Sequence, residues 1–256
     1  MKKKASTAPK KLPRSTIDAA EVRQFEALAT EWWDESGPMK PLHRLNPVRL
    51  GYLKKQICPF FKRDEDSFTP FKGLRVIDAG CGGGLVTEPL CRLGADVTGI
   101  DAGAENIKIA KEHARQHNLD IHYAATTVEK MAATGKTFDV VTALEIVEHV
   151  ADPSLFISAC CKLVKKNGLL VFSTLNRTPK SYLLGIIAAE YILRWVPAGT
   201  HNWKKFVRPA ELARPLEQDG FEITDISGLV YNPLRRGFSL STTDMDVNYF
   251  LTAKKL

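Results

Sequence analysis

From residue 74 onward, the apolar residues of this 256-residue chain fall into short blocks separated by amphipathic stretches. The blocks have the β-rich composition of strands and cover residues 74–79, 95–100, 120–124, 138–144 and 168–174. Apolar residues at helical spacing fill most of the intervals, at about 85–93, 104–117 and 153–165. Strands that alternate with helices build βαβ units, so the pattern predicts an α/β fold with a parallel sheet and right-handed crossovers.

The last third of the chain closes the predicted sheet. After a long helical region, strand-like runs occur at 221–227 and 246–254. The linker between them is too short for a helix and rich in turn residues, so the final strand should enter through a hairpin-like loop and run antiparallel. The sequence therefore predicts a seven-stranded, mostly parallel sheet whose last strand is antiparallel.

The first 72 residues follow a different pattern. Residues 18–35 carry apolar side chains at helical spacing behind Asp18, a suitable N-cap, and Pro47 is placed to open a second helix. A charged, proline-containing linker follows. We therefore expect an N-terminal helical cap over residues 18–72 in front of a main domain over residues 73–256.

The net charge of +7 belongs to one end of the chain. Residues 1–14 hold six basic residues and no acid, whereas the rest of the chain has 30 basic and 29 acidic residues. This balance argues against a face that binds nucleic acid. We expect residues 1–17 to form a disordered basic tail, with an electrostatic tether to anionic lipid as the alternative. A mitochondrial presequence would favour Arg over the Lys found here.

The tail and the cysteines both favour a cytoplasmic protein. The tail contains no apolar core of a secretory signal. The five cysteines show no C-x-x-C spacing, so they are expected to be reduced thiols that serve as packing residues.

A glycine-dense turn follows the first strand of the main domain. Asp78 lies near the end of that strand, and Gly80, Gly82 and Gly84 follow; Asp101 comes after the next strand, 21 residues beyond Gly80. Glycines let the backbone turn sharply and let a ligand lie against bare main chain. An acid at about this distance meets the ribose hydroxyls in nucleotide-binding βαβ units. The set predicts a nucleoside site, because a glycine-rich turn without a ligand does not explain the placement of Asp101.

The charge of this turn selects the cofactor. A dinucleotide-binding turn read from Gly80 requires Gly or Ala at position 85, where this chain has Leu85, and Asp78 would repel a pyrophosphate. S-adenosylmethionine carries no phosphate but has a cationic sulfonium and an ammonium, which both suit Asp78. The turn therefore indicates S-adenosylmethionine. After the third predicted strand, Val128 and Met131 are candidates to cover the adenine.

Two acids and a histidine follow the fourth predicted strand. Glu145, Glu148 and His149 lie at the strand edge where doubly wound sheets bind ligands. If residue 145 begins a helical turn, the three share one face and can hold a divalent cation such as Mg²⁺. Without a metal, His149 is a candidate general base, with Glu145 beside it as a second catalytic candidate. Alternatively, Glu145 packs against the cofactor while Glu148 and His149 cap a loop.

The remaining histidines are weaker candidates. His113, His117 and His122 lie on or after a predicted surface helix, so we expect them to be solvated. His43 and His201 fall in candidate lid segments, where they would lie near the methyl acceptor.

Segments outside the glycine turn match one known family. They are Phe25–Glu26, Glu31–Asp34, Lys40–Arg44, Asn46–Leu50, Ser173–Arg177, Ala189–Leu193, Gly199–His201, Tyr231–Pro233 and Asp246–Tyr249. Together with Asp78–Gly84 and Glu145–Val150, they resemble the ubiquinone biosynthesis O-methyltransferases over about residues 18–254. The resemblance implies the class I S-adenosylmethionine-dependent methyltransferase fold, which is Rossmann-like.

The resemblance also implies a substrate, partners and a set of ligands. The substrates are a polyprenylated catechol early in the pathway and the demethylated ubiquinol at its end, and a ubiquinone-biosynthesis complex is an implied partner. S-adenosylmethionine contacts are implied at Arg49, Gly80, Asp101 and the backbone around Leu144. Leu144 is a departure, because the family commonly has Met there. The eukaryotic branch resembles this chain at Glu145, Glu148 and His149, which bind magnesium in that branch.

Residues 181–196 are the most apolar stretch of the chain, inside an insertion over 177–207 that we interpret as a lid or membrane interface. The stretch is too short to span a bilayer, and Glu190 and Arg194 interrupt it. It fits either an interfacial helix or a buried crossover helix of the sheet.

The implied substrate favours the interfacial helix. Moving a polyprenyl chain from the bilayer into water costs roughly 0.8 kcal/mol of free energy for each CH₂ group exposed. The enzyme should therefore meet its substrate at an anionic membrane surface, as a cytoplasmic protein peripherally associated with the inner membrane. Two other functions stay open: another small-molecule O- or N-methyltransferase, and a non-catalytic lipid-binding scaffold with the same fold.

Overall fold

Strand β4 (Phe138–Leu144) shows why the apolar blocks form a sheet that is covered on both faces. In the computed structural model, which describes residues 15–184, 202–232 and 237–256, every residue of β4 is buried. Successive side chains of a strand point to opposite faces. Val141 and Ala143 pack into one core, and Val140 and Leu144 pack into the other. A strand covered on both faces is apolar throughout, as in the parallel sheets of α/β proteins.

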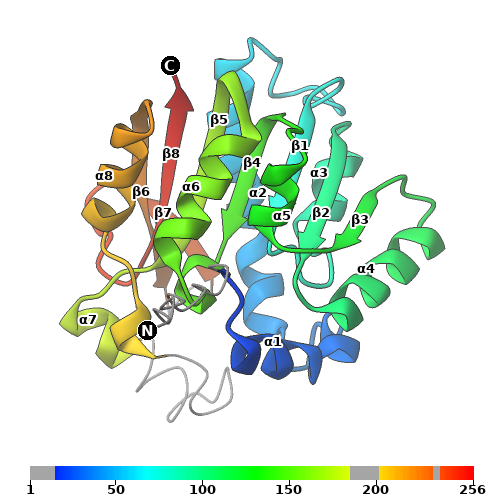
Figure 1. The fold of residues 1–256 in the computed structure, drawn as a ribbon, viewed down its shortest axis with the longest axis horizontal. Coiled ribbons are helices and arrows are strands. Elements are labelled where there is room, and N and C mark those ends of the chain that lie inside the picture. Colours follow the sequence, from blue (N-terminus) through cyan, green and yellow to red (C-terminus); the bar gives the residue numbers. More distant parts are fainter. Residues whose placement is uncertain (1–14, 185–201, 233–236) are drawn as a thin grey trace, which may run out of the picture.

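Eight strands form one sheet, in the order β3-β2-β1-β4-β5-β8-β6-β7 (Figure 1). The parallel part consists of β1 (Arg75–Ala79), β2 (Asp96–Asp101), β3 (His122–Ala125), β4 and β5 (Val164–Leu175). Strand β8 (Asn248–Lys255) runs antiparallel to its neighbours β5 and β6 (Phe221–Asn232). The strand order reverses between β1 and β4, and ligands of such sheets bind where the carboxyl ends of strands meet at a reversal.

The sheet has one strand more than the seven that the sequence predicts. Strand β7 (Gly237–Ser241) lies in the segment expected to be a hairpin-like loop, and it pairs antiparallel with an extended β6. The reason is an alternation of side chains, because Phe238 and Leu240 pack against the core that contains Phe250. The antiparallel direction predicted for the last strand is confirmed.

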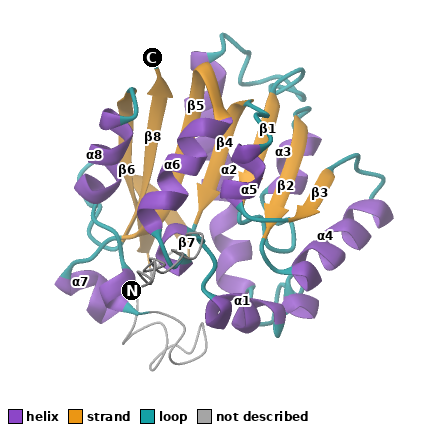
Figure 2. Ribbon diagram, in the orientation of Figure 1, coloured by secondary structure: helices purple, strands orange, loops and turns teal. Residues whose placement is uncertain are grey.

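Helices cover both faces of the sheet (Figure 2). One face carries α5 (Val128–Ala133), α6 (Pro153–Leu163) and α8 (Pro209–Gln218), and the other carries α2 (Lys40–Phe60) and α3 (Thr87–Arg92). Helix α4 (Ala104–Gln116) packs beside β3. Short helices lie in the connecting segments: η2 (Val147–His149) after β4, α7 (Pro179–Ser181) after β5 and η4 (Trp203–Lys205) before α8.

The first predicted helix is two separate pieces. Asp18 caps α1 (Ala19–Glu26) as expected, because its side chain accepts a hydrogen bond of 3.0 Å from the Ala20 N–H. The α-helix ends at Glu26, and a short 3₁₀ helix, η1 (Ala29–Glu31), follows it. The apolar pattern over 18–35 therefore spans a break in the helix.

The second helix begins earlier than predicted. Pro41 lies in the first turn of α2, where a missing N–H costs nothing, and Pro47 lies inside the helix instead of opening it. Leu53 and Ile57 of α2 are fully buried against the sheet. Most of α2 thus belongs to the second layer of the fold, although the sequence predicts it as part of a cap.

Two predicted segments lie largely outside the described residues: the tail up to residue 14, and residues 185–201 of the insertion with Glu190, Arg194 and His201. Across the described part of the chain, no helix is both long enough and apolar enough to cross a membrane.

Candidate active site

The edge of the sheet where the parallel strands end lies beside α1 (Figure 1). Side chains from distant parts of the chain line this edge. Two adjoining cavities lie there. We call the cavity lined by Asp101, Asn106 and residues 126–128 the Asp101 pocket, and the cavity lined by Arg49 and Glu148 the Arg49 pocket. Both are also lined by Phe25, Trp32, Gly80, Glu145 and His149, so they are two halves of one cleft.

The glycine turn is shaped by backbone conformation and by close packing. Gly80 has φ +79° and Gly82 has φ +52°, in the left-handed region that favours glycine. A Cβ atom at Gly80 would lie 2.6 Å from Cγ1 of Ile146, and one at Gly82 would lie 2.4 Å from the Trp32 ring. The turn therefore has no room for larger residues at either position.

Asp101 ties this turn to the end of β2. Its carboxylate accepts hydrogen bonds from the N–H of Gly82 (3.0 Å), the N–H of Gly103 (2.7 Å) and the side-chain amide of Asn106 (3.2 Å). Burial raises the pKa of Asp101, although these hydrogen bonds oppose the rise. The acid lines the Asp101 pocket, where the sequence places the ribose.

Asp78 lines the Arg49 pocket, but its carboxylate already has partners. The hydroxyl groups of Thr87 and Thr142 donate to its two oxygens at 2.7 and 2.8 Å. Burial raises the pKa of Asp78, and these two hydrogen bonds oppose the rise. Asp78 thus contributes a fixed, buried carboxyl group to the wall of the pocket.

Arg49 reaches the same pocket from α2. Its side chain is 5% exposed, and its Nη2 lies 3.6 Å from Oε1 of Glu145. Among the described residues, its Nε and Nη2 have no hydrogen-bond partner. Burial lowers the pKa of Arg49, and the charges of Glu145 and Asp78 oppose this. A buried guanidinium with unpaired donors is costly, so the pocket suits an anionic ligand.

Glu145 adopts a backbone conformation in which it does not begin a helical turn. Its φ is +53°, which is unusual for a residue with a side chain, and η2 begins only at Val147. Its carboxylate accepts hydrogen bonds from Ser173 Oγ (2.7 Å) and from Asn248 Nδ2 (3.0 and 3.1 Å). The left-handed residue breaks the helical spacing, so Glu145, Glu148 and His149 do not lie on one helical face.

Glu148 and His149 are held by different partners. Thr174 Oγ1 donates to Glu148 Oε2 at 2.8 Å, and His149 Nδ1 lies 3.0 Å from Glu21 Oε2. Burial raises the pKa of Glu148 to about 7, and the charge of Glu145 adds to this while His149 opposes it. Burial lowers the pKa of His149, but Glu21 and Glu148 outweigh it, so that pKa is raised above 6.5.

A chain of polar contacts joins His149 to the region after the insertion. Lys205 Nζ lies 2.8 Å from Glu21 Oε1 and 2.9 Å from Asp18 Oδ2. Glu21 therefore bridges η4 and the cleft. The sequence analysis missed Glu21 and Lys205, because nothing in the local pattern indicates a contact that joins residues 128 positions apart.

Of the other residues predicted to lie near the cofactor or the acceptor, some line the cleft and others pack elsewhere. Leu144 lines the Arg49 pocket, and Val128 lines the Asp101 pocket. Met131 is buried in the core of the sheet instead. His43 Nε2 lies 2.9 Å from the backbone oxygen of Trp32, so it supports the segment that covers the glycine turn.

The metal prediction is not reproduced as a compact cluster. Within the described part of the chain, Glu88, His113 and His117 form the one group of three such residues whose ligand atoms all lie within 4.8 Å of one another. Glu145, Glu148 and His149 form no such group, although all three line the Arg49 pocket.

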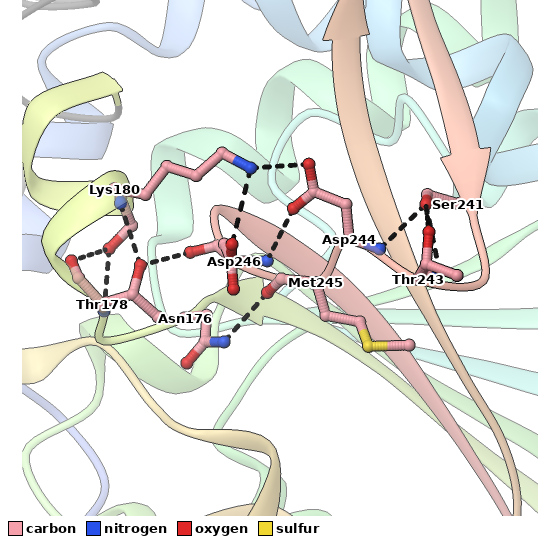
Figure 3. Close-up of polar contacts among 9 residues, drawn as sticks. Asn176, Thr178, Lys180, Ser241, Thr243, Asp244, Met245 and Asp246 are labelled. Carbon is pink, nitrogen blue, oxygen red and sulfur yellow. Dashed lines mark hydrogen bonds and ion pairs between the residues drawn. The ribbon is translucent and has the colours of Figure 1, made fainter.

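The segment that follows β5 is anchored on the loop between β7 and β8 (Figure 3). Lys180 Nζ lies 2.6 Å from Asp244 Oδ2, and Thr178 Oγ1 donates to the backbone oxygen of Asp246 at 2.5 Å. Asn176 Nδ2 donates to the backbone oxygen of Met245 at 2.9 Å. Three apolar side chains directly after α7 are about half exposed: Tyr182, Leu183 and Leu184.

Comparison with known proteins identifies the fold and the family. A family model described as a methyltransferase domain matches residues 50–226. Magnesium protoporphyrin IX methyltransferase from Synechocystis, solved with bound SAH, superposes with a TM-score of 0.59 at 20% identity, covering 93% of this chain and 94% of that one. A possible histamine N-methyltransferase from Thermotoga maritima gives a TM-score of 0.63 at 16% identity, with 92% and 100% covered. The predicted methyltransferase fold is thus confirmed.

A curated relative is much more similar. The ubiquinone biosynthesis O-methyltransferase of Roseobacter denitrificans is 52% identical over 243 residues, which are 95% of this chain and 98% of the relative. The chain therefore belongs to the ubiquinone biosynthesis O-methyltransferase family.

Proposed function

We propose that this protein transfers the methyl group of S-adenosylmethionine to a phenolic oxygen of ubiquinone precursors, namely a polyprenylated catechol and the demethylated ubiquinol. A relative named ubiquinone biosynthesis O-methyltransferase is 52% identical along nearly the whole chain, and this similarity supports the proposed class of methyl acceptor. The observation that carries the cofactor is the buried guanidinium of Arg49 at one end of the cleft, whose Nε and Nη2 have no hydrogen-bond partner among the described residues.

Each half of the cleft suits one part of the cofactor. S-adenosylmethionine supplies an electrophilic methyl group when bound, and it has a carboxylate at one end and a nucleoside at the other. The unpaired N–H groups of Arg49 suit the carboxylate. The carboxyl group of Asp101 and the apolar side chain of Val128 suit the nucleoside. Gly80, between the two halves, leaves bare main chain against the ligand.

His149 is the residue that we propose as the general base. It lines both halves of the cleft, and its contact with Glu21 fixes the orientation of the ring. A raised pKa brings the imidazole closer to neutral pH, where a base accepts a phenolic proton most effectively. Glu145 contributes by holding Arg49, since its carboxylate is fixed by Ser173 and Asn248.

Magnesium is the alternative to a histidine base. Two carboxylates and an imidazole lining one pocket have the donor chemistry for a divalent cation, and the raised pKa of Glu148 indicates a buried carboxyl group that a cation would stabilise. We propose that Glu145, Glu148 and His149 would hold it after turning from their present partners. Such an ion would lower the pKa of a bound phenol.

Methyl transfer to a short-chain prenylated catechol tests this function. We expect a methylated product in the presence of S-adenosylmethionine, at a rate that a chelator does not change, because a histidine base needs no metal. Loss of activity with a chelator and its recovery with Mg²⁺ would instead favour the magnesium alternative. Binding of S-adenosylhomocysteine without turnover of any prenylated catechol would favour a different small-molecule acceptor. No binding of S-adenosylhomocysteine would leave the lipid-binding scaffold.

We further propose that the protein meets its acceptor at an anionic membrane surface, as a peripheral protein of the inner membrane. The half-exposed Tyr182, Leu183 and Leu184 support this, because apolar side chains at the surface insert into a lipid interface. Lys204 is exposed nearby, whereas Lys205 is engaged by Asp18 and Glu21.

Co-sedimentation with vesicles that contain anionic lipid tests the membrane proposal. A Leu183→Ser/Leu184→Ser variant should bind vesicles less than the wild type. Phe68→Ser removes an apolar side chain that is 97% exposed elsewhere and should have no effect. Equal binding by all three proteins would exclude this segment as the interface. Association with other enzymes of the pathway remains a prediction.

A further inference from the structure

A second polar cluster lies outside the cleft, where α3 packs near α4. It consists of Glu88 from α3 and of His113 and His117 from the C-terminal end of α4. The two histidines are four residues apart, so they lie on the same side of the chain at the helix end. One ligand atom from each of the three residues lies within 4.8 Å of the other two. The sequence predicts both histidines to be solvated, yet the His113 side chain is only 21% exposed.

The carboxylate of Glu88 is buried, and among the described residues its two basic neighbours are the imidazole of His113 and the guanidinium of Arg92. Its side chain is 3% exposed, and Nδ1 of His113 lies 2.7 Å from its Oε1. Arg92 Nη2 is 4.0 Å away, and that side chain is half exposed. Buried carboxylates are normally paired or bound to a metal. Glu88 therefore sits in a place where a cation would stabilise it.

The hydrogen bonding of His117 orients its ring as in a metal ligand. Nδ1 of His117 lies 2.9 Å from the backbone oxygen of His113. A carbonyl oxygen only accepts, so Nδ1 is the donor, and Nε2 is the ring nitrogen left to bind a metal. Histidines that bind metals commonly donate their other N–H to such an oxygen.

The ring of His113 is fixed as well. Trp33 stacks on it, with ring centroids 3.5 Å apart and an interplanar angle of 6°. The Trp33 Nε1–H donates to the backbone oxygen of Gly83 at 3.0 Å, which holds the indole in place. The stacking covers a face of the imidazole, whereas the ring nitrogens lie at its edge.

We propose that Glu88, His113 and His117 bind a late first-row divalent metal, with Zn²⁺ as the ion that fits best. Two imidazoles and one carboxylate are a common set of three protein ligands for zinc, with a fourth position left for water. Magnesium prefers oxygen ligands, so it does not suit this cluster. The side chain of His117 is exposed, which gives the ion a route from solvent.

An ion here would brace the cofactor turn from outside the cleft. Glu88 donates its backbone N–H to the oxygen of Gly84 at 3.0 Å, and Trp33 joins His113 to Gly83. Metal binding would therefore link α3, which contacts the turn directly, to α4, which reaches it through Trp33. Because ligands that bind the native state stabilise it, zinc should also raise the melting temperature.

Zinc binding to the full-length, metal-free protein tests the proposal. The probe is Zn²⁺ alone, titrated in competition with a chromophoric chelator, and Co²⁺ serves as a spectroscopic substitute. We expect one tight equivalent in the wild type. Loss of a group that merely supports a metal ligand costs about 10- to 100-fold in affinity, so His117→Ala should cost at least about 100-fold. His113→Ala should do the same.

Matched variants make the outcome decisive. His122→Ala removes an exposed histidine outside the cluster and should leave zinc affinity within about twofold of the wild type. His117→Ala changes an exposed side chain at a helix end, so it keeps the test valid if His113→Ala fails to fold.

The visible spectrum of four-coordinate Co²⁺ should disappear in His117→Ala. Zinc affinity equal in wild type and His117→Ala would overturn the proposal and leave an ion pair of Glu88 and His113. So would zinc binding that is lost in His149→Ala instead.

Discussion

The two halves of the cleft are assembled in different ways. In the Asp101 pocket, the acid bonds to groups that are 19, 2 and 5 residues away in the sequence. Around Glu145, Glu148 and His149, the partners are Ser173, Thr174, Asn248 and Glu21, at separations of 28, 26, 103 and 128 residues. One half is thus largely a local property of a βα turn, and the other requires the assembled sheet and the docked N-terminal helix.

This difference separates what each half contributes. The turn at Gly80 is fixed by its own backbone and by close packing, so we expect it to define where a cofactor lies. The segment from Glu145 to His149 is held by polar side chains from distant parts of the chain. We therefore expect changes in the turn to affect cofactor binding strongly, and changes around His149 to affect mainly the chemistry and its pH dependence.

Gly80→Ala should weaken cofactor binding more than any other variant considered below. The added Cβ would lie 2.6 Å from Cγ1 of Ile146, and the alanine would have to adopt the left-handed backbone conformation of Gly80. Overpacking costs about 1–3 kcal/mol and moves the backbone, so we expect the affinity for S-adenosylhomocysteine to fall by about 100-fold. Isothermal titration measures this.

Gly73→Ala is the matched control. Gly73 has the same φ of +79° but no atom within 4 Å of an added Cβ. This variant should lose about 1–2 kcal/mol of unfolding free energy from the backbone alone, while its affinity for S-adenosylhomocysteine stays unchanged. If both variants lose affinity equally, the close packing of the turn does not define the cofactor site.

Arg49→Met tests whether the two halves share one ligand. A hydrogen bond to a charged group contributes about 1.5–3 kcal/mol, so the affinity for S-adenosylhomocysteine should fall by about 10- to 100-fold. The control is a second ligand, 5′-methylthioadenosine, which lacks the carboxylate. Its affinity should be the same in wild type and variant. A parallel loss for both ligands would show that Arg49 supports the fold of the pocket and does not contact a carboxylate.

The same contrast explains what the sequence can and cannot predict. The parallel sheet, the Asp78–Gly84 turn and Asp101 follow from local patterns, because strand periodicity and glycine conformation act over a few residues. Arg49 was implied only by resemblance, since a buried guanidinium on α2 has no local signal. Residue 145 does not begin a helical turn, because its backbone is left-handed, and the strand alternation before it gives no sign of that.

Glu148→Gln probes the half that long-range contacts assemble. The folded pKa of about 7 lies above the usual value of 4.5, so the folded protein binds this proton more tightly than the unfolded chain. Glu148 therefore lowers the free energy of unfolding progressively as the pH rises from about 4.5 to 7, and this destabilisation is complete above that range. Near pH 8, the variant should be about 1–3 kcal/mol more stable than wild type, and near pH 4 the two should be equal.

Chemical denaturation at both pH values measures this difference. If Mg²⁺ binds Glu148, adding it near pH 8 should stabilise the wild type but not the variant, and should narrow the gap between them. A variant that is less stable than wild type at both pH values would contradict the raised pKa.

The smallest expected effect concerns Glu21, the residue that links His149 to the N-terminal helix. In Glu21→Gln the ring loses its charged partner, so the pKa of His149 should fall. A base works only when deprotonated, and the acidic limb of kcat/KM should therefore move to lower pH. At pH values below that limb, kcat/KM of the variant should exceed that of the wild type. On the plateau above it, loss of the fixed ring orientation should make the variant a few-fold slower.

Lys205→Met is the control. It removes the ion pair with Glu21 but keeps the carboxylate beside His149, so the acidic limb of its pH profile should not move to lower pH. A residue that only stabilised α1 would lower the rate equally at every pH. A crossing of the two profiles in Glu21→Gln alone would therefore show that a side chain 128 positions away sets the proton affinity of the base.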